Sequence, residues 1–247
     1  RPMNRLLQGD VGCGKTAVAV YSMLAALAES SKGYQVAMMA PTGILAEQHY
    51  LTLKSLLDKA DIRMLFLSNA SASDRERNLQ QIARGEVDLV VGTHALIQED
   101  VEFNKLALLV IDEQHRFGVE QRHQLQQKGT RPDVLIMTAT PIPRTLTLTC
   151  FGDMDVSIID EFPPDHSEVE TELLPPYRWR RGFKKALREL EAGNRVFVVF
   201  PLVEENENLD LTSAKEGFEQ LANGVFSRYD CALLHGQMPG EDKNRVM

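Results

Sequence analysis

The sequence has 247 residues, of which 43% are hydrophobic, and a formal net charge of −8 at pH 7. This length and apolar content allow a sizeable buried core, in one large domain or one and a half smaller ones. The acidic balance excludes a general electrostatic attraction to nucleic acid, so any contact with DNA has to be local or made by parts outside this sequence.

Cysteine usage and hydropathy indicate the cellular compartment. Three cysteines, Cys13, Cys150 and Cys231, form no pairing pattern, which predicts a reducing cytoplasm and not a disulfide framework. The sequence shows no signal peptide and no apolar stretch long enough to cross a bilayer, so we expect a cytoplasmic protein without a membrane partner. Because Arg1 leads almost at once into a strand and Met247 ends a helix-like run, we also expect an internal piece of a longer protein.

The first strong feature is a glycine-rich loop between a short apolar run, Leu6-Leu7, and a helical segment. It follows the phosphate-binding spacing of Gly, four residues, then Gly-Lys-Thr. Glycines let backbone N–H groups converge on one anion, and the helix adds the positive end of its dipole. Lys15 is expected to reach the β- and γ-phosphates, and the Thr16 hydroxyl to bind Mg²⁺. The predicted nucleotide-binding residues are Gly9, Asp10, Val11, Gly12, Cys13, Gly14, Lys15 and Thr16.

Apolar runs then alternate with amphipathic segments, which is the pattern of a parallel sheet covered by helices. Strands are expected at Arg5–Gln8, Gln35–Ala40, Met64–Leu67, Leu89–Gly92, Leu106–Asp112, Val134–Thr138 and Val156–Ile159. Helices are expected at Lys15–Ser30, Ile44–Lys59, Ala72–Arg84, Val119–Gln127 and Thr145–Phe151. The sequence therefore predicts an α/β fold with a mostly parallel sheet.

The expected strand Leu106–Asp112 runs directly into Asp112-Glu113-Gln114-His115. Carboxylates at the carboxyl end of a buried strand lie at the edge where open α/β sheets bind ligands, and the glycine-rich loop leaves from that edge too. Asp112 is expected to hold Mg²⁺, and Glu113 to orient and deprotonate the attacking water. Taken alone, an acidic pair after a strand is more often a helix cap, but the upstream phosphate loop favours catalysis.

Two further polar turns follow buried strands, and the residues themselves leave their role open. Thr138 and Thr140 are candidates to sense the γ-phosphate through the acidic segment, or they are plain turn residues, since Thr and Pro favour such corners. Thr93 and His94 are candidates to hold a phosphodiester through a hydroxyl and backbone amides. A lone histidine such as His94 is more often structural.

The alternation breaks at Glu161–Pro164, where two prolines follow an acidic pair. A second alternation begins after Pro175-Pro176. Its expected elements are helix Trp179–Glu191, strand Arg195–Pro201, helix Leu211–Ala222, strand Cys231–Leu234 and a helix from Gly240 onward. We therefore predict a nucleotide-binding domain at 1–160, a linker at 161–178 and the truncated start of a second domain at 179–247.

Taken in order, these motifs resemble the superfamily 2 helicases of the DExH kind, and more specifically the bacterial RecG family of branched-DNA translocases. The segments that carry the resemblance cover most of the chain and are Met3–Thr16, Ala40–Tyr50, Val91–Glu99, Val110–Arg122, Met137–Thr145, Val156–Pro164, Pro201–Glu205 and Leu234–Gly236. The resemblance implies a RecA-like P-loop NTPase domain followed by part of a second RecA-like domain.

The same resemblance implies an ATP-dependent DNA helicase, a monomeric motor that remodels stalled forks and Holliday junctions in DNA repair and recombination. Its implied catalytic residues are Lys15, Glu113, Gln114 and His115, with Mg²⁺ held by Thr16 and Asp112. The implied coupling residues are Gln114, His115, Thr138 and Thr140. DNA contacts are implied at Pro41, Thr42, Thr93, His94 and Arg144. ATP is expected to close two RecA-like domains and hydrolysis to open them, which advances the duplex.

Some features depart from the family pattern. Gly43 stands where the family usually carries Glu, and Cys13 where Ser is common. The family's wedge domain, the adenine-recognising stretch before the loop and the arginine finger of the second domain are not in this sequence. Because such an arginine contributes several powers of ten in rate in related nucleotidases, we expect this chain alone to bind nucleotide weakly and hydrolyse it poorly.

Two other functions compete with this interpretation. A transcription–repair coupling translocase shares the motor but usually has Glu at the position of Gln114, and the run Val119–Arg122 also favours the RecG family. A nucleotide-gated DNA-binding module without useful turnover would not need Glu113. A GTPase is disfavoured because no Asn-Lys-x-Asp sequence follows the loop, and a small-molecule kinase would not need the Thr-Ala-Thr element or a second α/β domain.

Overall fold

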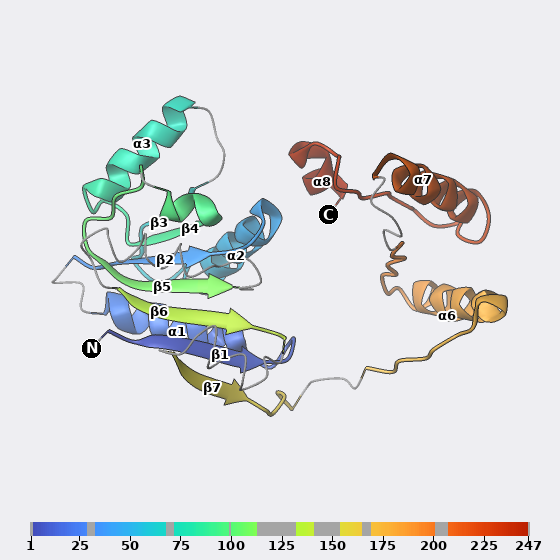
Figure 1. Cartoon of the computed structure of the whole chain (residues 1–247), viewed down its shortest axis with the longest axis horizontal. Helices are drawn as coiled ribbons and strands as arrows, with labels where there is room; N and C mark the ends of the chain where they lie inside the picture. Colours follow the sequence, from blue (N-terminus) through green and yellow to red (C-terminus); the bar gives the residue numbers. More distant parts are fainter. Residues whose placement is uncertain are drawn as a thin grey trace. The chain divides into compact units, whose positions relative to one another are not determined.

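A computed structural model describes residues 2–28, 33–67, 72–98, 100–112, 132–140, 154–164, 169–200 and 207–246. The chain divides into two compact units, Arg1–Ser167 and Glu168–Met247 (Figure 1). The predicted helices Val119–Gln127 and Thr145–Phe151 lie outside the described residues. Among the described residues, no helix is long and apolar enough to span a membrane.

The first unit is built on a sheet of seven strands. They are β1 (Asn4–Gly9), β2 (Gln35–Met39), β3 (Met64–Leu67), β4 (Leu89–Gly92), β5 (Leu106–Asp112), β6 (Asp133–Thr138) and β7 (Asp155–Ile159). Their order across the sheet is β3-β4-β2-β5-β6-β1-β7, and every neighbouring pair is parallel. All seven strands predicted for this part are confirmed, and the predicted mostly parallel sheet is parallel throughout.

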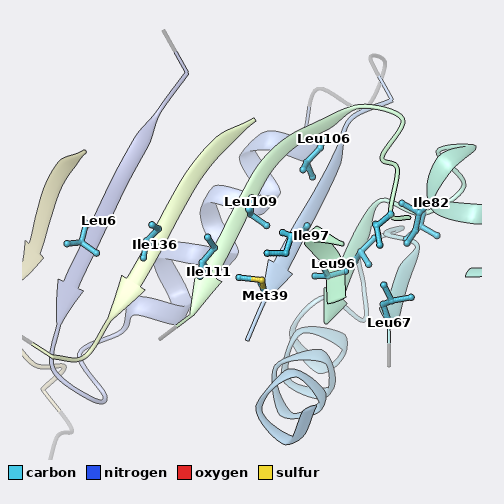
Figure 2. Close-up of a cluster of buried hydrophobic side chains, with 14 residues drawn as sticks. Leu6, Met39, Leu67, Ile82, Leu96, Ile97, Leu106, Leu109, Ile111 and Ile136 are labelled. Atoms are coloured by element: carbon cyan, nitrogen blue, oxygen red, sulfur yellow. The ribbon is translucent and has the colours of Figure 1, made fainter. Parts of the chain in front are cut away.

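Burial explains why these runs are strands. Every residue of β2 and β4 is buried, as expected for central strands covered on both faces, whereas β7 at the sheet edge is half exposed. Figure 2 shows Leu6, Ile136, Ile111 and Met39 in a row across β1, β6, β5 and β2. These four side chains are register partners from strand to strand, so one apolar face runs continuously across the sheet.

Helices cover both faces of the sheet. Helices α1 (Lys15–Leu27) and α2 (Gly43–Leu56) bury Ala19, Met23 and Leu53 in the core of one face. Helix α3 (Ala72–Ala83) and the 3₁₀ turn η2 (His94–Ile97) bury Ile82, Leu96 and Ile97 in the core of the other. Each of the three α-helices lies where the sequence predicted one, with ends that differ by up to three residues.

A buried glutamine fixes one end of this sheet. Gln35, at the start of β2, is 1% exposed. Its Nε2 donates to the carbonyl oxygens of Ile82 (3.1 Å) and Val87 (2.8 Å), and its Oε1 accepts from the backbone N–H groups of Asn104 (2.8 Å) and Lys105 (3.3 Å). One side chain therefore satisfies four backbone groups, and it ties β2 to the end of α3 and to the start of β5.

The regular elements described in the second unit are all helical. This unit contains the 3₁₀ turn η3 (Pro176–Arg178) and helices α6 (Trp179–Glu191), α7 (Glu207–Asn223) and α8 (Gly240–Val246). Phe183 of α6 packs edge-to-face on Trp179 (ring centroids 5.2 Å apart) and on Phe226 (5.6 Å), which is 5% exposed. Arg181 and Lys185 pair with Glu172, which ties the start of α6 to the segment before it.

Two strands predicted in this unit are wrong. Residues 195–200 and 231–234 form no strand, although Arg195–Pro201 and Cys231–Leu234 are apolar enough to be strands; Pro201 lies outside the described residues. A strand is stabilised by hydrogen bonds to a neighbour, and no described residue of the second unit is in a strand. Phe197 and Val199 are accordingly 81% and 84% exposed, and both segments line a hollow of about 830 Å³.

Candidate functional site

The glycine-rich loop and Asp112 lie at the same edge of the sheet. The loop leaves the carboxyl end of β1, and Asp112 ends β5. Asp112 is in register with Met137 of β6, and Met137 with Leu7 of β1, so β6 alone separates the two strands at this level. With neighbouring strands about 4.8 Å apart, the two strand ends are about 10 Å apart. This span suits a ligand held between them.

Two glycines of the loop have backbone conformations that other residues rarely adopt. Gly12 and Gly14 have φ angles of 83° and 99°. Gly9 is needed for a different reason: a Cβ there would lie 2.5 Å from Cys13 Sγ and 3.1 Å from the Ile159 carbonyl oxygen. The loop therefore packs against the end of β7 with no room for a side chain, and the two other glycines turn the backbone inward.

The start of α1 is left open to an anion. Gly14 occupies the cap position, and in the part of the chain that the structure describes no side chain caps this helix start. The Lys15 ammonium folds back over the loop and donates to the carbonyl oxygens of Gly9 (2.8 Å) and Asp10 (2.7 Å). An anion that docks at the helix start would compete with these neutral carbonyls for a charged donor, and anionic acceptors bind such donors more strongly.

Asp112 is held by a histidine that the sequence analysis did not single out. His49 Nε2 of α2 lies 2.6 Å from Asp112 Oδ2, and the two side chains are only 15% and 17% exposed. His49 lies within the resembling segment Ala40–Tyr50, yet nothing in its local pattern marks it as a site residue. The available signal was its position three residues after Ala46 and four before Leu53, which places a polar group on the buried face of the helix.

The two threonines after β6 contact each other. Thr138 Oγ1 lies 3.0 Å from Thr140 Oγ1 and accepts the Thr140 backbone N–H at 3.2 Å. Thr138 is 1% exposed and pairs in register with Gln8, just before the loop. The turn that follows β6 is therefore at the same edge as the loop and Asp112, and its hydroxyls stabilise the turn itself.

Pro41-Thr42 and Thr93-His94 are brought together because they follow neighbouring strands. Met39 of β2 pairs with Gly92 of β4, and the Ala40 N–H donates to the Gly92 carbonyl at 2.9 Å. The Thr42 hydroxyl accepts from the Leu45 N–H at 3.3 Å and caps α2, and the Thr93 hydroxyl accepts from the Ala95 N–H at 3.5 Å at η2. Pro41, Thr42 and His94 are exposed, so this paired corner faces solvent.

Four of the predicted site residues lie outside the described residues: Glu113, Gln114, His115 and Arg144. The described donors at the edge suit a hard cation. Mg²⁺ prefers oxygen ligands and is usually held by one or two protein groups together with phosphate oxygens. The Asp112 carboxylate and the Thr16 hydroxyl, at the ends of β5 and of the loop, are donors of that kind.

Comparison with known proteins decides the family. The family described as DEAD/DEAH box helicase matches residues 2–149. The chain belongs to this family. It is also 47% identical over 248 residues to the protein named ATP-dependent DNA helicase RecG of Thermotoga maritima. The aligned region covers 100% of this chain and 31% of that relative. The relative of the same name in Streptococcus pneumoniae is 50% identical, over 99% of this chain and 36% of its own length.

A solved structure agrees with these relatives. The structure titled "Structure of RecG bound to three-way DNA junction" is 42% identical, with a TM-score of 0.75, over 100% of this chain and 31% of the other. The resemblance to RecG drawn from the motifs is thereby confirmed, as is the RecA-like helicase fold of the first unit. Dbp5 of S. cerevisiae, at 16% identity and a TM-score of 0.62, shares the fold. This DEAD/DEAH box chain spans about a third of the length of the curated relatives it matches.

Proposed function

We propose that this chain is the motor part of a RecG-type ATP-dependent DNA translocase, which remodels branched DNA such as stalled forks and Holliday junctions in repair and recombination. The observation that supports this most is spatial. The Lys15 loop and Asp112, nearly a hundred residues apart in sequence, lie at one edge of the sheet with a single strand between them. That placement fits a nucleoside triphosphate whose phosphates lie on the loop.

The proposed roles at the nucleotide follow from the donors present. The loop amides and the start of α1 hold the phosphates, and Lys15 exchanges its contacts with Gly9 and Asp10 for phosphate oxygens. Thr16 and Asp112 would hold Mg²⁺, which when bound neutralises charge on the β- and γ-phosphates. Glu113 deprotonates the attacking water.

The proposed DNA contacts come from a different pair of strands. Pro41, Thr42, Thr93 and His94 follow β2 and β4, with Arg144 as a further contact. Gln114, His115, Thr138 and Thr140 couple hydrolysis to movement. Residues 179–247 are proposed as the start of a second RecA-like domain after a linker at 161–178, so that nucleotide-driven closing and opening moves the duplex. A cytoplasmic location follows from this role.

Two substitutions test the proposal. Lys15→Ala should lower affinity for a fluorescent ATP analogue by at least about 100-fold, since it removes the cation that meets the phosphates. Glu113→Gln should retain the analogue but lower turnover in the intact protein by about 10²- to 10⁴-fold, the contribution of a general base. Lys54→Ala, an exposed lysine in the last turn of α2, is the matched control.

The DNA part is tested by comparing turnover of the intact protein on forked, duplex and single-stranded DNA. Forked DNA should stimulate turnover most. Equal rates on all three DNAs would argue against remodelling of branches. Unchanged hydrolysis in Glu113→Gln would remove that residue from its role, and normal nucleotide binding in Lys15→Ala would contradict the site itself.

A further inference from the structure

The contact between His49 and Asp112 is a short hydrogen bond between two largely covered side chains. His49 Nε2 and Asp112 Oδ2 are 2.6 Å apart, at the short end for a nitrogen–oxygen hydrogen bond. An ionised carboxylate offers only acceptors, so Nε2 carries the hydrogen and donates it. Both side chains are more than four-fifths covered, which limits competition from water. One oxygen of the carboxylate is thus held in place by a neighbouring helix.

The fold leaves His49 little freedom to point elsewhere. Ala46 and Leu53, at 0% exposure, lie on the same helix face and bury it against the sheet. The next residue, Tyr50, stacks on Phe66 of β3 with ring centroids 5.6 Å apart. These contacts set the rotation of α2, and α2 follows β2, the strand directly beside β5. Asp112 is the last residue of β5, so a well-packed helix positions the side chain at its end.

Two roles are compatible with such a contact. In a structural role, His49 would supply a hydrogen bond to a partly buried carboxylate, and its loss would lower the stability of the unit whatever the ligand. In a positioning role, the hydrogen bond would hold the carboxylate in the orientation that a metal needs. Outer groups that orient a metal ligand typically contribute 10- to 100-fold in metal affinity. The two roles predict different measurements.

We infer that His49 is a positioning residue for the Asp112 carboxylate and sets the affinity of the site for the divalent cation that accompanies the nucleotide. This inference rests on the proposed function, because it takes Asp112 as a ligand of that cation. The 2.6 Å contact holds Oδ2 and restricts the rotation of the carboxylate, which would leave Oδ1 for the cation or its water. Without His49, the carboxylate samples several rotamers and the cation binds more weakly.

The test measures binding of a fluorescent ADP analogue to the full chain across a Mg²⁺ titration and in EDTA. His49→Ala should raise the Mg²⁺ concentration for half-maximal effect by about 10- to 100-fold and leave affinity in EDTA unchanged. His49→Gln should restore most of the Mg²⁺ affinity, since the glutamine amide nitrogen reaches about as far as the histidine Nε2 and donates a hydrogen bond. His49→Asn, which is one methylene shorter, should behave like His49→Ala. Thr52→Ala, exposed on the same helix, is the control.

Each outcome decides the matter. An unchanged Mg²⁺ titration in His49→Ala overturns the inference, as does an equal loss of melting temperature in Mg²⁺ and EDTA with no change in Mg²⁺ affinity. If His49→Ala fails to fold, the comparison of His49→Gln with His49→Asn takes its place, and equal Mg²⁺ titrations in those two overturn it. If the unmodified chain binds the analogue without any Mg²⁺ dependence, the proposed function fails first. If the wild type binds the analogue in a Mg²⁺-dependent way and His49→Ala shows the same Mg²⁺ titration, only the role of His49 is refuted.

Discussion

The two units of this chain contain apolar runs of similar composition, but the run in the first unit is a buried strand and the run in the second is not a strand. In the first unit, Leu106–Asp112 is a strand with neighbours on both sides, and Val110 is 0% exposed. In the second, residues 195–200 contain three valines and two phenylalanines, form no strand, and leave Val199 84% exposed. An apolar β-branched run thus becomes a strand only when a partner strand is available to take its hydrogen bonds.

The largest expected contrast between these regions is in amide hydrogen exchange. Amides of β5 should exchange only when the first unit unfolds, because both neighbours hold them in the ladder. Amides of residues 195–200 have no such ladder within the described structure and should exchange almost freely. Protection should differ by about a thousandfold or more, given global stabilities of roughly 5 to 15 kcal/mol. Hydrogen exchange followed by mass spectrometry measures this protection, and equal protection would show that residues 195–200 are hydrogen-bonded in solution.

Gln35→Ala should give the next largest effect. It leaves two carbonyl oxygens and two N–H groups without their buried partner, and we expect a loss of about 3 kcal/mol in the free energy of unfolding of the first unit. Gln80→Ala, at an exposed position of α3, is the control and should change little. Urea unfolding followed by circular dichroism is the measurement. A loss under about 1 kcal/mol would mean that water replaces the glutamine.

A matched pair of valines, one in each unit, differs in burial. Val110→Ala removes two buried methyl groups from β5 and should cost about 2 kcal/mol of unfolding free energy. Val199→Ala removes the same groups from an exposed position and should change stability by less than about 0.5 kcal/mol. Thermal unfolding of both variants provides the test. Similar losses in the two would show that Val199 is buried in solution.

The smallest predicted effect concerns pH. A hydrogen bond from the Arg63 side chain lowers the pKa of Asp88; burial opposes this shift, and the Arg63 backbone N–H and charge add to it. Since the folded pKa is depressed, the stabilisation is present above the unfolded value near 3.8 and is lost as pH falls through the folded pKa. Asp88→Asn should therefore cost about 1 kcal/mol at pH 7 and progressively less below about pH 4.

The measurement for Asp88 is a series of urea midpoints from pH 7 down to pH 3. Asp58→Asn, an exposed carboxylate between α2 and β3, serves as the control. A difference between wild type and Asp88→Asn that grows as the pH falls would have the wrong sign for this ion pair, and would contradict the assignment.

The fold of the first unit could be predicted because its central strands, such as β2 and β4, are uninterrupted buried runs between turn residues. The loop and Asp112 could be placed at one edge because carboxyl ends of parallel strands share an edge. His49 could not be found this way, since its contact depends on how α2 rotates on the sheet, and that rotation is set by Ala46 and Leu53 together with the Tyr50–Phe66 stack. The two strands wrongly predicted in the second unit have the opposite cause. Their local apolar pattern is typical of strands, but a local pattern does not show whether a neighbouring strand is present to pair with them.

The strand order has a consequence for how the protein is made. Among the described strands β1 pairs with β6 and β7 alone, and Asn4 lies opposite Val134, so β1 must wait until β6 has been synthesised before it can pair. At about 5 to 20 residues per second, that wait is on the order of ten seconds. During translation the glycine-rich loop therefore follows an unpaired strand, and the edge that brings the loop and Asp112 together forms only late in the synthesis of this unit.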